Sequence, residues 1–157
     1  MSFSTLSLRT GLLATVTAAT LALGGCAMSP MGSSNDMSDN SARFGATLAA
    51  AAEVPPNGST GSGMVDATLD KRSNVLSWRM VYSGLSGPAT MAHFHGPAMP
   101  GTNAGVALPI PNAMSPAQGQ ATLTAAQVAD LMAGKWYANV HTAANPGGEI
   151  RGQMMVK

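Results

Sequence analysis

From Arg43 to the C-terminus, the sequence alternates between short apolar segments and turns that contain glycine or proline. Segments such as Phe44–Ala52 and Gly63–Leu69 have the length of strands, whereas an amphipathic helix needs a longer periodic stretch. The 18 Gly and 10 Pro of this 157-residue chain supply the breaks between them. Repeated short strands of this kind predict an all-β fold, an antiparallel β-sandwich with one short helix.

The clearest strand is Val75–Tyr82, in which Leu76, Trp78, Met80 and Tyr82 alternate with smaller or polar residues. Alternate residues of a strand share a face, so these four side chains are candidates for the core. Further strands are expected at Ala89–His95, Val106–Ile110, Trp136–His141 and Glu149–Val156. Pro109 within Val106–Ile110 and Pro111 directly after it favour an edge position for that strand.

The single helix is expected between Thr124 and Gly134. Thr124 and Gln127 have the spacing of a capping box, in which each side chain accepts from the other's backbone N–H. Gly134 lies where a C-terminal glycine is common. Val128 and Leu131 lie on one side of such a helix, so we expect this side to pack on the sheet.

The N-terminus has the pattern of an export signal. The apolar stretch Gly11–Leu23 follows Arg9 and ends in two glycines before Cys26, the single cysteine. It is too short to span a bilayer, which takes about 20 residues. We therefore expect 1–25 to be a lipoprotein signal peptide and Cys26 to be lipidated, since the segment resembles a bacterial lipobox. The alternative is an ordinary signal peptide with an incidental cysteine.

The expected mature chain has two parts, a flexible Met/Ser-rich tether at 26–42 and a β-sandwich domain at 43–157. No acidic residue follows Cys26 directly, and resemblance to lipoproteins then implies an exported, periplasmic protein, lipid-anchored in the outer membrane. Eight Lys and Arg against seven Asp and Glu, a net charge of +1, argue against a nucleic-acid partner. The oligomeric state stays open.

All three histidines lie in two predicted strands. His93 and His95 are two residues apart and share a face, on which Met91 also lies. If the strand that ends at His141 is a neighbour, its imidazole can join them as a third ligand and leave a fourth position open. Imidazoles suit copper and also zinc, and a nearby thioether favours copper, as Cu(I) or Cu(II). The alternative is three histidines that are hydrogen-bonded within the fold.

Five segments in fixed order resemble the CHRD domain, a family named for chordin and also found in bacterial exported proteins. These segments are Glu53–Pro56, His93–Gly96, Leu131–Gly134, Tyr137–Thr142 and Gly147–Gln153. The resemblance covers about 43–157 and implies an immunoglobulin-like or superoxide-dismutase-like antiparallel β-sandwich. It also implies that His93, His95 and His141 are the metal ligands.

Three further residues, Asn139, Glu149 and Arg151, are candidates for supporting roles. Glu149 could orient a ligand histidine, or it could form a structural pair with Arg151, two residues away on the same strand face. Asn139 could hydrogen-bond a ligand or a turn. Glu53, with the prolines that follow it, is interpreted as a strand end.

The residues favour a lipid-anchored periplasmic metal-binding protein that handles copper as a carrier, store or scavenger. A periplasmic protein that gives or takes the ion is a further candidate partner. A protein-interaction or envelope-structural module without metal is the alternative, and a copper redox enzyme comes third. A two-metal site of the superoxide dismutase kind would need more than three histidines. No motif for a nucleophilic serine is present.

Overall fold

The computed structural model describes residues 40–157. The expectations for the signal peptide at 1–25, for Cys26 and for most of the tether at 26–42 lie outside the described residues. The elements, in chain order, are β1 (Ser41–Ala49), the 3-10 turn η1 (Ala50–Ala52), β2 (Ser62–Asp70), β3 (Val75–Ser83), β4 (Ala89–His95), β5 (Val106–Pro109), β6 (Ala117–Thr122), α2 (Ala125–Met132), β7 (Tyr137–Thr142), β8 (Ile150–Gln153) and β9 (Met155–Val156).

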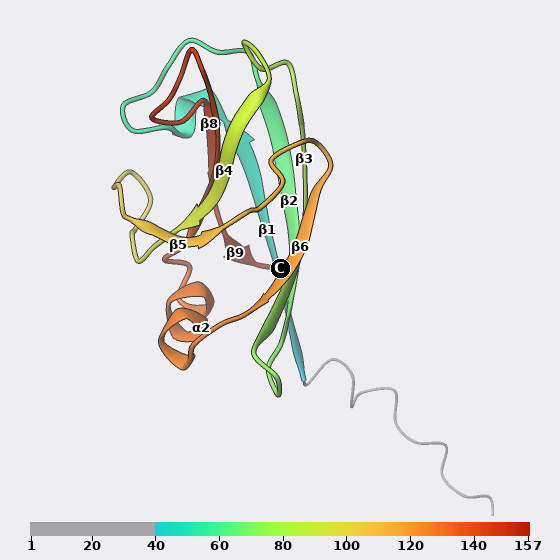
Figure 1. Ribbon diagram of the computed structural model, residues 1–157. Helices are drawn as coiled ribbons and strands as arrows, with labels where there is room; N and C mark the ends of the chain where they lie inside the picture. The colour runs from blue at the N-terminus through green and yellow to red at the C-terminus, as the bar shows by residue number, and fades with distance from the viewer. Residues whose placement is uncertain (1–39) are drawn as a thin grey trace, which may run out of the picture. The chain divides into compact units, whose positions relative to one another are not determined.

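The strands form one antiparallel sheet in the order β5-β4-β7-β8-β1-β2-β3-β6, and β9 pairs with β1. The sheet curls so that β1, β2, β3 and β6 face β4, β5 and β8 across a core (Figure 1). Trp78 of β3 meets Phe94 of β4 edge to face, with ring centroids 5.5 Å apart. The prediction of an all-β, antiparallel sandwich with one short helix is confirmed.

The core contains three of the four side chains that the alternation in β3 predicted, and the fourth, Tyr82, is partly buried and packs against it. Leu76 and Met80 are fully buried, and Trp78 is 5% exposed. Burying such side chains removes apolar surface from water, which stabilises each by about 1.5–3 kcal/mol. The opposite face of β3 carries Ser77 and Arg79, which are exposed.

Three differences from the predicted strands are larger than a shift of one residue at a strand end. β1 begins at Ser41 and ends before a turn at Ala50–Ala52. The last predicted strand is interrupted at Met154, whose side chain is fully buried and whose backbone N–H donates to Trp136 O at 2.9 Å. β6 was not predicted, because Ala117–Thr122 contains no large apolar residue.

Packing against a large side chain explains why β6 carries small residues. Gly119 of β6 pairs with Trp78 of β3. A Cβ atom at Gly119 would lie 2.6 Å from the indole Cζ2 atom of Trp78, closer than real contacts allow. The indole therefore occupies the volume that a larger residue at this position would need.

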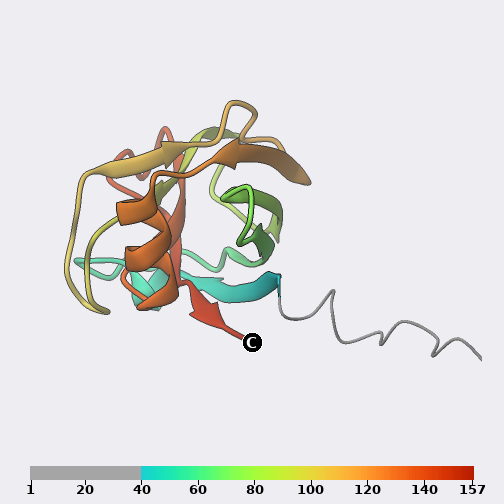
Figure 2. The ribbon, with the colours of Figure 1, turned by 90° about the horizontal axis from the view of Figure 1, so that it is seen from below.

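Helix α2 begins as predicted. Thr124 Oγ1 accepts from Gln127 N at 3.2 Å, and Gln127 Oε1 accepts from Thr124 N at 2.9 Å, which completes the capping box. Leu131 is buried, and α2 lies at one end of the sandwich in both views (Figures 1 and 2). Within 40–157, no helix has the length and apolar character needed to cross a membrane.

Candidate metal centre

Strands β4 and β7 are neighbours, and their register brings the three histidines to one face of the sheet. Met91 pairs with His141, His93 with Asn139, and His95 with Tyr137. Directly opposite residues of an antiparallel pair project to the same side. One ligand nitrogen from each of His93, His95 and His141 therefore lies within 4.8 Å of the others.

A backbone carbonyl determines which nitrogen of His141 is available. Its Nδ1 atom lies 2.9 Å from Pro146 O, and because a carbonyl only accepts, Nδ1 carries the proton. In the neutral ring the Nε2 atom then presents a lone pair, to which His93 Nδ1 can donate at 3.2 Å. Asn139 Oδ1 lies 3.0 Å from the same Nε2 atom, and because both atoms are acceptors in this tautomer, this approach is a contact and not a hydrogen bond. Asn139 therefore contacts His141, and the ligand role of His141 stays a prediction.

His95 is oriented in the same way by the loop that follows β4. Its Nδ1 atom donates to Ala104 O at 2.9 Å, which again leaves Nε2 with a lone pair. This Nε2 atom is buried and has no hydrogen-bond partner in the described part of the chain. An unpaired buried nitrogen costs free energy, on the order of 1–3 kcal/mol, unless another group occupies the position in front of it.

The surroundings of His93 and His141 favour the neutral imidazole, which is the form that metals bind. Burial lowers the pKa of His93, and the neighbouring His141 and His95 lower it further. Burial also lowers the pKa of His141, and His95 adds to this effect, although the contact with Pro146 opposes it. Both rings are therefore neutral at pH 7, and no proton has to be removed from a charged ring before a metal binds.

The spacing of the nitrogens fits a metal ion. Two imidazole nitrogens bound to one ion at about 2.0–2.1 Å, with an angle near tetrahedral, lie about 3.2–3.4 Å apart. His93 Nδ1 and His141 Nε2 are 3.2 Å apart. The group contains three imidazole donors and no carboxylate from the described residues, so the ligands would add no negative charge to a bound ion.

A methionine lies beside the histidines, as the strand spacing predicted. Met91 is directly opposite His141 across the β4–β7 pair and is 46% exposed. Its thioether is thus on the same face as the imidazoles, at the solvent side of the group. A soft ligand in this position would favour copper.

The Tyr137 ring packs against His95, and Arg151 packs against the Tyr137 ring. The sequence did not reveal this arrangement. The Tyr137 ring stacks on His95 with centroids 4.8 Å apart and 3° between the planes. The guanidinium carbon of Arg151 lies 3.3 Å from the Tyr137 centroid. Arg151 also donates to Asn103 Oδ1 at 2.8 Å and to Thr102 O at 2.5 Å, and both acceptors lie in the loop that carries Ala104.

Glu149 has neither of the roles considered from the sequence. Its carboxylate accepts from Ser59 Oγ (2.6 Å), from the backbone N–H and hydroxyl of Ser86 (2.6 Å each) and from Thr142 Oγ1. Within the described chain, neither a histidine nor Arg151 hydrogen-bonds to it. Burial by itself would raise the pKa of Glu149, but these donors outweigh it and lower the pKa to about 2.

Glu53 is a buried acid rather than simply a strand end. It is 6% exposed, and its Oε1 atom has no partner within 40–157. Burial raises its pKa to about 7, against the attraction of Arg151 and a backbone hydrogen bond. A Cβ atom at Gly148 would lie 2.5 Å from Oε1, so the carboxyl packs directly on the Gly148 backbone.

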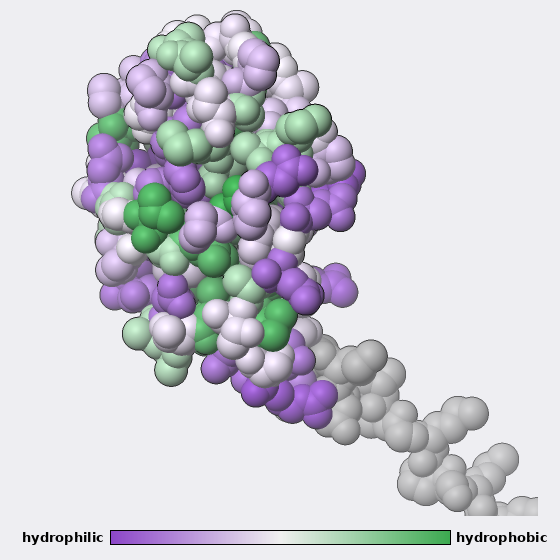
Figure 3. All heavy atoms as spheres, in the orientation of Figure 1, coloured by the Kyte–Doolittle hydropathy of each residue, from purple (hydrophilic) through white to green (hydrophobic). Residues whose placement is uncertain are grey.

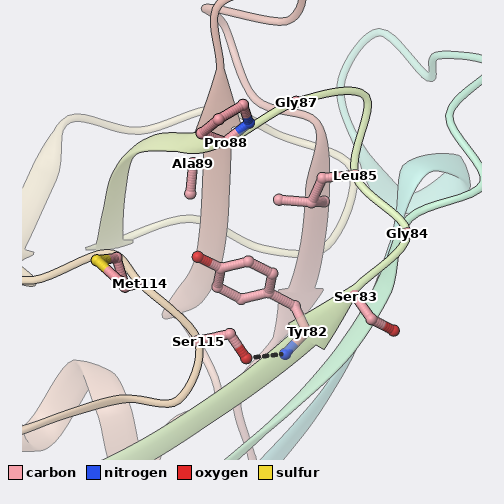
Figure 4. Close-up of a pocket in the computed structure, with 9 residues that line it drawn as sticks. All are labelled: Tyr82, Ser83, Gly84, Leu85, Gly87, Pro88, Ala89, Met114 and Ser115. Carbon is pink, nitrogen blue, oxygen red and sulfur yellow. Dashed lines mark hydrogen bonds between the residues drawn. The ribbon is translucent and has the colours of Figure 1, made fainter.

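A separate hollow of about 320 Å³ lies near the β3–β4 connection (Figure 4). Tyr82 and Met114 line it, and Ser115 Oγ accepts from Tyr82 N at 3.0 Å. None of the three histidines borders this hollow. On the face seen in Figure 3, hydrophilic and hydrophobic residues are interspersed.

Comparison with known proteins places the chain in a family. Searches of curated proteins and of solved structures gave no match. The family model of the CHRD domain matches residues 44–154, which include every strand from β2 to β8 and all three histidines. The chain therefore belongs to the CHRD domain family.

Proposed function

We propose that this protein is an exported, lipid-anchored metal-binding protein that holds copper between His93, His95 and His141. The observation that carries the proposal is the buried Nε2 atom of His95, which has no partner in the described residues and belongs to the group of convergent imidazole nitrogens. A metal ion at this position would supply the missing partner.

The donor set supports copper before zinc. Three neutral imidazoles bind either ion, and the thioether of Met91 beside His141 adds a soft ligand that copper prefers. Three protein ligands leave a further coordination position for water, for Met91 or for a ligand from a partner protein. Such an open position suits a carrier, store or scavenger, because the ion can be exchanged through it.

Export and anchoring rest on the sequence. The apolar stretch before Cys26 supports a signal peptide, and the unique cysteine at its end supports lipidation. A lipidated Cys26 would hold the domain at the periplasmic side of a membrane, where a partner protein could deliver or accept copper.

The purified protein is titrated with Cu(I) under anaerobic conditions, and with Cu(II) and Zn(II) in air, each against a competing chelator. We expect 1:1 binding of copper, with zinc weaker. Absence of binding by a folded protein would overturn the proposal and would favour the protein-interaction module, with the histidines as structural residues.

A further inference from the structure

Three flat groups, Arg151, Tyr137 and His95, are stacked in a column behind the candidate metal site. Tyr137 lies parallel to His95, and the Arg151 guanidinium covers the other end of the column, 3.3 Å from the Tyr137 centroid. The three residues come from β8, β7 and β4, which are consecutive strands of the sheet. Arg151 is 2% exposed and Tyr137 3%, so solvent screens this column little.

The column places a permanent positive charge near the ion. The guanidinium carbon lies 3.3 Å from the Tyr137 centroid, which lies 4.8 Å from the His95 centroid. The charge is therefore on the order of 10 Å from an ion at His95 Nε2. The imidazole ligands add no negative charge to the site, so a higher charge on the ion increases its repulsion by Arg151.

We propose that Arg151, acting through Tyr137 and His95, determines the specificity of the site by favouring a monovalent soft cation, Cu(I), over Cu(II) and Zn(II). The inference rests on the proposed function, namely that the three histidines bind copper. At about 10 Å and an effective dielectric constant of about 20, one additional unit charge on the ion changes an equilibrium constant about tenfold.

Two other buried charges must be weighed against Arg151. Glu53 faces Arg151 and attracts it, but its raised pKa of about 7 leaves much of the carboxyl neutral at pH 7. Glu149 lies beyond Thr142, whose side chain projects from β7 on the opposite side from His141. The Glu149 carboxylate also accepts hydrogen bonds from Ser59, Ser86 and Thr142, which partly compensate its charge.

The test compares Arg151→Met with Arg151→Lys in the purified protein. Met removes the charge and keeps an unbranched chain, whereas Lys keeps the charge. Both variants lose the fork of hydrogen bonds to Asn103 and Thr102. The ratio of the Cu(I) and Cu(II) affinities is measured by chelator competition, and the copper midpoint potential by redox titration.

We expect Arg151→Met to lower the Cu(I)/Cu(II) affinity ratio about tenfold, equivalent to about 59 mV in potential for one electron. Arg151→Lys should retain most of the wild-type ratio. An unchanged ratio in Arg151→Met, or equal losses in the Met and Lys variants, would overturn the inference, because positioning alone would then explain the effect.

Glu53→Gln provides an independent test if Arg151→Met does not fold. At pH 8, where the Glu53 carboxyl is mostly ionised, its removal should raise the Cu(I)/Cu(II) ratio, opposite in sign to Arg151→Met. No change, or a lower ratio, would contradict the inference. If the wild-type protein binds neither copper ion, the proposed function itself fails, and that result differs from binding with an unaltered ratio.

Discussion

The Nδ1 atom of His93 lies 3.2 Å from the Nε2 atom of His141. Because Pro146 holds the proton of His141 on Nδ1, Nε2 can only accept, and in the metal-free protein the proton between the two rings belongs to His93 Nδ1. The same two nitrogens would face a bound metal. Metal binding therefore replaces one shared proton by one ion and shifts the His93 proton to its other nitrogen.

Replacing His93 and His141 together by Ala should abolish stoichiometric metal binding and leave the fold intact. The hydrophobic core lies on the other face of β4 and β7, where Phe94 and Val140 are fully buried. We expect the free energy of unfolding to change by about 2 kcal/mol or less. Chelator competition and thermal unfolding measure the two effects. Gln120→Ala on the exposed face of β6 is the control, and undiminished binding by the folded double variant would eliminate the three-histidine site.

Replacing Asn139 by Asp should shift the preference of the site toward zinc. Asn139 Oδ1 is 3.0 Å from His141 Nε2 and the residue is 3% exposed, so an aspartate there would add an anionic oxygen beside the imidazole nitrogens. Two histidines and a carboxylate form a common zinc set. We expect zinc affinity to rise about tenfold relative to Cu(I), since a hard, anionic oxygen favours the divalent ion over the soft monovalent one. Asn139→Ala, which removes the oxygen, is the comparison, and an equal zinc preference in both variants would contradict the prediction.

Replacing Glu149 by Gln should destabilise the fold strongly. The fully buried carboxylate connects Ser59, Ser86 and Thr142, which come from three separate connections or strand ends. Gln keeps the size but loses charge-assisted hydrogen bonds, and we expect a loss of about 2–4 kcal/mol in the free energy of unfolding at pH 7. Urea denaturation measures it.

Glu149 also makes the free energy of unfolding of the wild-type protein depend on pH in the acid range. The folded pKa of Glu149, about 2, is below its ordinary value of 4.5, so its stabilising contribution is present above pH 4.5. That contribution is lost as the pH falls from about 4.5 to about 2. Glu149→Gln should flatten the pH dependence of stability in this range, and a slope equal to that of the wild type would contradict the assignment.

The raised pKa of Glu53 predicts a pH dependence of the free energy of unfolding that is opposite in sign to that of Glu149. Its folded pKa, about 7, is above the ordinary value of 4.5, so the neutral acid is the form that stabilises the fold. The contribution of Glu53 to the free energy of unfolding is fully present below pH 4.5 and is lost as the pH rises through 7. Glu53→Gln should remove this slope and increase stability at pH 8 by on the order of 1 kcal/mol, after allowance for solvent screening. Thermal unfolding at pH 5 and pH 8 measures the difference, and a destabilised variant at pH 8 would contradict it.

Local sequence patterns were sufficient for much of the fold. Alternation in Val75–Tyr82 predicted which face of β3 is buried, and Thr124 with Gln127 predicted the start of α2. Both patterns act over a few residues, through the two-residue period of a strand and the first turn of a helix. β6 escaped prediction because Gly119 is small for a reason outside the strand, the indole ring of Trp78.

For the candidate site, the sequence by itself determined which side chains share a face. The spacing of His93 and His95 did so within β4, and His141 could join them only if β7 was the neighbouring strand. That pairing is a tertiary property, as are the carbonyls of Ala104 and Pro146 that orient two of the rings. Long-range packing likewise determined the contacts of Tyr137 and Arg151 and the hydrogen-bond partners of Glu149. Strand periodicity shows the direction of a side chain, whereas its contacts depend on residues that lie far away in the chain.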